Sequence, residues 1–142
     1  MTLSVMYDNS SLEIEGNADA LRKLSLKISG CDGTCQVTLP DFSEVNERGL
    51  GYANGLTISV GSGPVSIARL EKHILISGSK EKLQVLAQNF LWLADREKPE
   101  TLTKIRDHLH IDYYPGHFFL EEGALPLTIS RQDDLAPRIR IR

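Results

Sequence analysis

Two histidines on one predicted strand have the clearest potential for chemistry. His108 and His110 alternate with Leu109 and Ile111, so both imidazoles emerge on the same face of the strand. Two imidazoles at this spacing can bind one transition metal, and His117 could supply a third ligand. A metal site of these three histidines is the alternative interpretation. We favour structural or interface histidines and expect no cofactor.

The remaining reactive side chains do not form a recognisable catalytic motif. The chain has no G-x-S-x-G elbow, and Gly61–Gly63 lacks both the later glycine and the helix of a phosphate-binding loop. The paired acids Glu121–Glu122 and Asp133–Asp134 are adjacent, so on a strand their carboxylates point to opposite faces. We therefore predict no catalytic residue.

The two cysteines are expected to be structural thiols. Cys31 and Cys35 flank a turn-like sequence, and no second cysteine pair exists to complete the roughly four ligands of a zinc site. A reducing compartment favours free thiols.

The stretch from His73 to Arg131 predicts a strand, a helix and two further strands. The strand His73–Ser77 forms a hairpin with Val65–Leu70, and the helix from Ser79 to Asp95 follows. Further strands are predicted at His108–Tyr114 and Ala124–Ser130.

The first half of the chain repeats this order. Leu12–Asn17 aligns with Ile74–Ser79, and the same shift of 62 positions (12 to 74) places two leucines of each predicted helix on one another, Leu21 on Leu83 and Leu24 on Leu86. With a different shift, Leu56–Ser59 resembles Leu127–Ser130. Chance similarity of short apolar patterns is the alternative.

We predict an α+β fold in one domain spanning residues 1–142. Two βαββ units, at about residues 1–62 and 63–131, would form a largely antiparallel sheet of about six to eight strands, with both helices on one face and a tail at 132–142. At fold level alone, such a duplication resembles metal-chelating glyoxalases and dioxygenases. Those enzymes place metal ligands in both repeats, whereas the first repeat here contains no histidine.

The second predicted helix carries two apolar stripes. Six residues at helical spacing are expected to face the core: Leu83, Leu86, Ala87, Phe90, Leu91 and Ala94. Trp92 and Val85 lie on roughly the opposite side. We expect this second stripe to pack under the connector Pro99–Asp107 or the C-terminal tail, or to bind a partner.

Composition is that of an ordinary globular domain, with 41% hydrophobic and 25% charged residues. No apolar run approaches the ~20 residues of a membrane helix, and the N-terminus lacks signal-peptide features. These observations predict a cytoplasmic protein without a membrane partner.

The chain carries a net charge of −3, and without the three arginines of the tail 138–142 the rest of the chain, its body, has 13 basic and 19 acidic residues. Such a body argues against nucleic-acid binding and suits a basic partner, although solubility alone also explains it.

The richest candidate surface is the segment Asp112–Glu122. Aromatic anchors dominate protein-binding hot spots, and here they lie in a turn-rich segment flanked by acids. The candidate contact residues are Asp112, Tyr113, Tyr114, His117, Phe118, Phe119, Glu121 and Glu122. A polar loop with Asp41, Glu44 and Glu47 is expected to assist. The alternative is that the two phenylalanines fill the edge of the core.

The second half of the chain resembles immunity protein family 32 of bacterial polymorphic toxin systems. The resemblance rests on His108–Asp112, Pro115–Phe119 and Ala124–Ile129, and on Ile76–Ser79 with the leucines that follow. It implies a small cytoplasmic α+β protein that binds and blocks a cognate secreted toxin and needs no catalytic residues. Many toxins of this kind are basic nucleases, which an acidic body would capture quickly.

Two other classes of function stay open at this point. One is an enzyme or small-ligand binder that uses the concave sheet face near His108 and His110. The other is a homodimeric structural module that pairs through the Trp92 helix face or a sheet edge.

Overall fold

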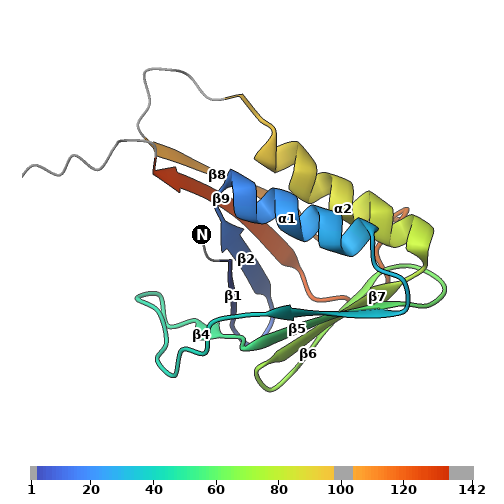
Figure 1. Ribbon diagram of the computed structural model, residues 1–142. Coiled ribbons are helices and arrows are strands. Elements are labelled where there is room, and N and C mark those ends of the chain that lie inside the picture. Colours follow the sequence, from blue (N-terminus) through green and yellow to red (C-terminus); the bar gives the residue numbers. More distant parts are fainter. Residues whose placement is uncertain (1–2, 98–103, 135–142) are drawn as a thin grey trace, which may run out of the picture.

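The structure, a computed structural model, describes residues 3–97 and 104–134, which form two sheets and two helices (Figure 1). Sheet A contains, in spatial order, β4 (Gly51–Tyr52), β1 (Ser4–Tyr7), β2 (Leu12–Gly16), β9 (Leu127–Asp134) and β8 (Lys104–Ile111). Sheet B contains β3 (Thr34–Thr38), β5 (Gly55–Val60), β7 (His73–Gly78) and β6 (Ser66–Leu70). The helices are α1 (Ala18–Ser29) and α2 (Lys80–Ala94).

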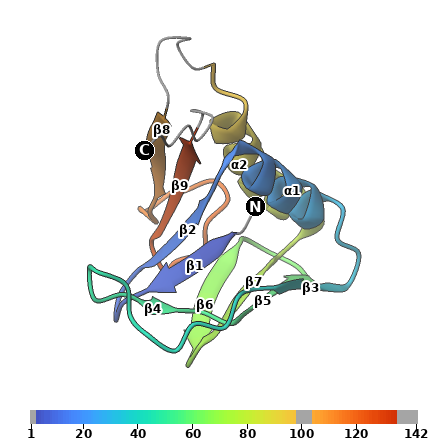
Figure 2. The same ribbon diagram turned by 60° about the vertical axis from the view of Figure 1, so that its left-hand side comes forward.

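The two sheets and the helix pair enclose the core on three sides (Figure 2). The inner faces of the strands and one stripe of each helix are apolar, as the alternation in the sequence requires. No helix in the described ranges has the length and apolar character needed to span a membrane.

The α+β prediction is confirmed, but the strands form two sheets where one was predicted. The hairpin β1–β2 pairs with β9 of the second half, whereas the hairpin β6–β7 pairs with β5 of the first half. Both of these joins between halves are parallel, and the other strand pairs are antiparallel. Along the chain, each helix connects a strand of one sheet to a strand of the other. Each sheet therefore contains strands from both halves of the chain.

The pairing register relates the segments that resemble each other in sequence. In sheet A, Leu12 and Ile14 lie opposite Leu127 and Ile129. In sheet B, the corresponding residues Ile74 and Ile76 lie opposite Leu56 and Ile58. Two duplicated units related by an approximate twofold axis would produce this arrangement. The duplication itself stays a prediction.

The helices touch at residues that the same alignment makes equivalent. Ser25 on α1 is buried and donates from its hydroxyl to the carbonyl oxygen of Ala87 on α2, at 2.8 Å and 62 positions along the chain. Small residues at this point let the two helix backbones approach closely. The helices begin where predicted, because the side chains of Asn17 and Ser79 accept hydrogen bonds from the amides of Ala20 and Lys82.

One residue of the predicted α2 core stripe is wrong. Leu91 is 36% exposed, whereas Leu93, which the prediction left out, is fully buried. The centre of the buried stripe lies between Phe90 and Leu83, and at 100° per residue Leu93 falls closer to that centre than Leu91 does.

A buried ion pair on β9 joins the two helices to sheet A. Arg131 and Asp133 are 4% and 6% exposed, and Arg131 Nε donates to Asp133 Oδ2 at 2.8 Å. Arg131 Nη1 also donates to the carbonyl oxygens of Leu93, Ala94 and Arg96, at 2.9, 3.0 and 3.0 Å, where α2 ends. Asp133 Oδ1 accepts from the Ala18 amide at 2.8 Å, where α1 begins. Each charge thus lies at the helix end whose dipole it stabilises.

Replacing the arginine should destabilise the whole fold. Arg131→Met would leave the Asp133 carboxylate buried without its charge partner and three carbonyl groups without a donor. We expect a loss of about 3–5 kcal/mol in the free energy of unfolding, measured in urea. Gln132→Met, at the exposed neighbouring position, is the control and should change stability by less than about 0.5 kcal/mol. Equal stability of the two variants would contradict this role.

Candidate functional site

An apolar groove opens between α2 and the outermost strand of sheet A, β8. We call it the aromatic groove. Its volume is about 450 Å³ and it is lined by Val85, Gln88, Asn89, Trp92, Leu109 and Phe118. Trp92 and Phe118 are 55% and 63% exposed, which is unusual for side chains of this size and makes this surface the candidate site.

Three elements bring these side chains together. Trp92 lies on the side of α2 opposite the core stripe. Leu109 lies on the inner face of β8, opposite Ile129, and is only partly buried at the sheet margin. Phe118 comes from the loop of residues 112–126, which we call the aromatic loop. Two surfaces predicted separately, the Trp92–Val85 stripe and the aromatic segment, are therefore one surface in the fold.

The aromatic loop is anchored along its length. Val65, just before β6, exchanges two backbone hydrogen bonds with it, donating to Phe119 O at 2.7 Å and accepting from the Glu121 amide at 2.8 Å. The Leu125 amide donates to Ile67 O at 3.0 Å. Lys82 Nζ donates to Phe118 O at 2.8 Å, which ties the loop to α2. The exposed Phe118 ring is thus carried on a fixed backbone, so little order is lost when a partner binds.

His117 organises the loop as a neutral imidazole. Its Nδ1 accepts from the backbone amides of Phe119 and Leu120, at 3.3 and 3.0 Å. The rings of Tyr114 and Phe119 lie with their centroids 4.7 and 4.6 Å from the imidazole. Burial lowers the pKa of His117, which agrees with its role as an acceptor.

The predicted contact residues in this loop divide into exposed and buried groups. Tyr114 is 57% exposed and Tyr113 partly buried. The acids Asp112, Glu121 and Glu122 are exposed around the loop. The prediction that Phe119 contacts a partner is corrected, because this ring is only 5% exposed and belongs to the core. Of the two adjacent phenylalanines, one fills the core and the other faces outward.

The acidic loop, which is the polar loop that carries Asp41, Glu44 and Glu47, lies beside β4 and apart from α2 and β8, the elements that line the aromatic groove (Figure 1, Figure 2). Asp41, Glu44 and Glu47 are exposed, and Asp41 pairs with Lys72 at 3.4 Å. Arg48 of this loop pairs with Glu13 on β2 at 2.8 Å. Glu47 and Arg48 border a polar hollow of about 460 Å³ on the outer face of sheet A. The expected cooperation of the acidic loop with the aromatic segment at one contact surface therefore has no geometric basis.

The three histidines of the metal hypothesis are not arranged as a ligand set. His108 and His110 share the outer face of β8, with ring centroids 5.5 Å apart, and His110 Nδ1 lies 3.0 Å from Thr128 Oγ1. His117 holds the aromatic loop instead. Within residues 3–97 and 104–134, no three His, Cys, Asp or Glu side chains are placed to hold a metal ion.

Both cysteines are free thiols, with Cys31 buried and Cys35 partly buried. Burial raises the pKa of Cys31 to about 11, with a smaller contribution from the neighbouring Cys35. The Cys31 thiol is therefore protonated at neutral pH and a poor nucleophile.

Sequence reasoning missed two features of this region. One is the pair Arg131–Asp133, because the adjacent acids Asp133 and Asp134 give no local sign that one of them pairs with Arg131 in the interior. The other is the place of Leu109 in the groove, since the sequence does not show that α2 leaves the last strand partly uncovered. The connector before Lys104 and the tail after Asp134, which were expected to cover Trp92, lie outside the described residues.

The groove, the aromatic loop and Arg131 all belong to one continuous part of the chain. Residues 73–132 match the family model of Immunity protein 32. This match confirms the resemblance seen in the second half of the sequence, and it covers less than half of the chain. No curated protein matches the chain.

The Immunity protein 32 segment contains β7, α2, β8, the aromatic loop and most of β9. All six residues that line the aromatic groove fall inside it. The acidic loop lies outside it, and the polar hollow takes residues from both parts.

The adjacent phenylalanines provide a matched stability test. Phe119→Ala should lower the free energy of unfolding by about 3–5 kcal/mol, because it leaves a cavity in the core. Phe118→Ala should change it by less than about 0.5 kcal/mol, because that ring is mostly in solvent. Urea unfolding of both variants measures the difference. Similar losses would show that our assignment of the two rings is wrong.

Acid should loosen the aromatic loop through His117. The folded-state pKa is lowered from 6.5, so the stabilisation by neutral His117 is complete above pH 6.5 and is lost as the pH falls below it. We expect His117→Gln to lose less thermal stability than the wild type between pH 7.5 and 5. His108→Gln, which changes an exposed imidazole on β8, should keep the wild-type loss. If His117→Gln lost as much thermal stability between these pH values as the wild type, the role of His117 in the acid response would be contradicted.

Proposed function

We propose that this protein is a cytoplasmic immunity protein that binds a cognate bacterial toxin and neutralises it without catalysis. The observation that carries the proposal is the aromatic groove, which lies entirely within the Immunity protein 32 segment. The aromatic groove is the proposed toxin contact.

The side chains of the groove suit tight binding of a protein surface. Trp92 and Phe118 are large and exposed, and they line the groove together with the aliphatic side chains of Leu109 and Val85. Burying such rings in a complex dominates the binding energy of many interfaces. Arg96 lies over the Trp92 ring, 5.1 Å from its centroid, and restricts the rotamers of that side chain.

Charges at the rim would contribute mainly to the rate of association. Asp112, Glu121 and Glu122 are exposed on the aromatic loop, and the body of the chain is acidic. A basic toxin would be attracted to this surface before the apolar groove is covered. The acidic loop at Asp41, Glu44 and Glu47 would add to the long-range attraction rather than to the contact itself.

The shifted pKa values of four groups have local structural causes. Hydrogen bonds to Ser10 and Ser11 lower the pKa of Asp8, and a hydrogen bond to Glu13 raises that of Arg48. Burial accounts for most of the Cys31 shift and for that of His117.

The proposal is tested with a candidate toxin chosen from the products of the genes next to this one. We expect the wild type to restore growth of cells that express the toxin and to bind it in vitro. The double variant Trp92→Ser/Phe118→Ser should bind at least ~100-fold more weakly and fail to protect, because both anchors are removed. Surface plasmon resonance measures the affinity, and circular dichroism checks that the variant is folded.

Leu70→Ser is the matched control. Leu70 is an apolar side chain that is 77% exposed on β6, outside the groove, so its loss should leave toxin binding unchanged.

Full protection by the double variant would exclude the groove as the contact. Lack of binding by the wild type would exclude neutralisation of this toxin. A dimer that light scattering detects in the wild type, and that Trp92→Ser dissociates, would favour a homodimeric module.

A further inference from the structure

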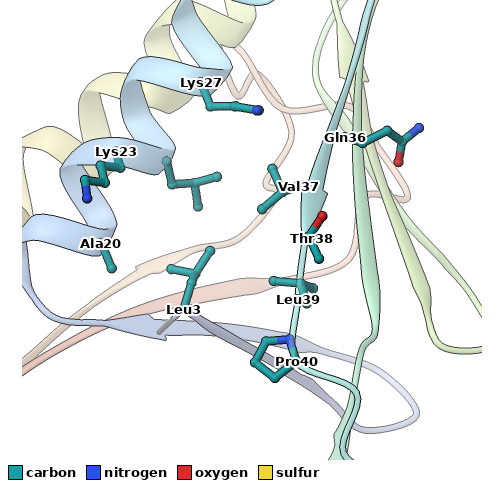
Figure 3. A pocket seen from close by; sticks show the side chains of 10 residues that line it. Leu3, Ala20, Lys23, Lys27, Gln36, Val37, Thr38, Leu39 and Pro40 are labelled. Atoms are coloured by element: carbon teal, nitrogen blue, oxygen red, sulfur yellow. The ribbon is translucent and has the colours of Figure 1, made fainter. Parts of the chain in front are cut away.

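A second cleft lies between α1 and β3, whereas the aromatic groove is lined by α2 (Figure 3). We call it the α1–β3 cleft. Its volume is about 540 Å³, within the range of ligand sites. The lining residues are Leu3, Ala20, Lys23, Leu24, Lys27, Gln36, Val37, Thr38, Leu39 and Pro40. All of them lie outside the Immunity protein 32 segment, so the proposed toxin contact does not use this cleft.

The cleft follows the backbone of β3 rather than one face of the strand. Side chains of successive strand residues point to opposite faces, yet the consecutive residues from Gln36 to Pro40 all line it. A cleft with this lining runs along the open edge of the strand. Figure 3 shows Val37 of β3 and Leu39 just after the strand on one side, and the lysines of α1 on the other.

The hydrogen-bond pattern shows which backbone groups face the cleft. Gly33 O accepts from the Val60 amide at 2.7 Å, and β3 and β5 are antiparallel. In an antiparallel pair, every second residue directs both its N–H and its C=O group to the partner strand. Counting from Gly33, the residues between these positions are Thr34, Gln36 and Thr38. Their N–H and C=O groups therefore point away from β5. No other strand of the described chain pairs with this edge.

The edge of β3 lacks the usual protection against pairing. Its five residues carry no charged side chain and no proline. Natural edge strands are commonly protected by charges, prolines or a covering segment. The other two long edges have such features, since β8 carries charged residues and β6 is bonded by the aromatic loop.

The rim of the cleft is basic. Lys23 and Lys27 extend from α1 beside the apolar floor of Leu3, Leu24 and Leu39 (Figure 3). Lys23 pairs with Asp19 of its own helix at 3.2 Å, and Lys27 has no ion pair among the described residues. Figure 3 shows Lys27 pointing across the cleft toward β3, where its ammonium group would meet a carboxylate of a bound segment.

We propose that the α1–β3 cleft accepts an extended segment of a partner polypeptide, which adds to sheet B as a strand beside β3. Backbone hydrogen bonds to Gln36 and Thr38 hold the segment, and its inward side chains enter the cleft. These side chains are apolar, with a carboxylate that meets Lys27. A second copy of this chain fits less well, because pairing two β3 edges brings two sets of lysines toward each other.

The probe is a labelled, acetylated and amidated seven-residue peptide that alternates threonine with leucine, glutamate and valine. Fluorescence anisotropy should show saturable binding to the full chain. A matched peptide with lysine in place of glutamate should bind about tenfold more weakly. Methylating the edge-facing amides of the glutamate peptide should abolish binding, because it removes the donors of the backbone ladder without altering the protein.

Two protein variants assign the site. Lys27→Glu should reverse the preference between the two peptides. Gln36→Pro should abolish binding of both, because it removes an edge-facing N–H that β5 does not use. Gln36→Thr keeps that N–H and should bind like the wild type. Thermal unfolding of each variant verifies the fold, and the methylated peptide tests the ladder even if Gln36→Pro does not fold.

Three results would overturn the proposal. They are failure of the glutamate peptide to bind the wild type, equal affinity for the glutamate and lysine peptides, and undiminished binding of the methylated peptide. Concentration-dependent dimerisation that Gln36→Pro abolishes would assign the edge to a second copy instead. Trp92→Ser should bind the glutamate peptide like the wild type, so this test and the toxin test succeed or fail separately.

Discussion

The buried ion pair of Arg131 and Asp133 is the interaction on which the arrangement of layers depends. One strand, β9, uses it to hold the end of α2 and the start of α1 at the same time. Burying two charges is unfavourable unless every polar atom has a partner, and here helix carbonyls and an amide supply those partners. The pair therefore fixes where both helices lie on sheet A. The Ser25–Ala87 contact then sets how closely the helices approach.

The positions of the helices determine which parts of the sheets stay uncovered. Each helix covers the middle of the core, while β8 and β3, the outermost strands on either side, extend beyond this cover. A cleft forms at both margins. On the α2 side the lining consists of aromatic, aliphatic and amide side chains, and on the α1 side of aliphatic and uncharged polar side chains with two lysines. Similar geometry in the two halves thus presents two chemically different surfaces.

Local signals predicted much of this structure. The helix caps at Asn17 and Ser79, the hairpin of β6 and β7, and the buried stripes around Leu21 and Leu83 all depend on neighbouring residues, and all are confirmed. The division into two sheets was not predicted, because parallel pairing of β2 with β9 joins residues more than a hundred positions apart. The candidate site was predicted in part. Tyr114 and Phe118 are exposed as a contact surface requires, whereas periodicity in an irregular loop cannot show that Phe119 turns inward.

The sequence by itself determined the fold class, the helix boundaries and the resemblance of the second half to immunity proteins, because composition, capping and short motifs are properties of contiguous residues. Only the tertiary structure decided that Trp92, Leu109 and Phe118 share one groove and that the acidic loop lies elsewhere. It also revealed that Arg131 and Asp133 are paired in the interior, and that the open edge of β3 borders a basic cleft. These features arise from contacts between distant segments, whose geometry is set by how the helices pack on the two sheets rather than by any local pattern.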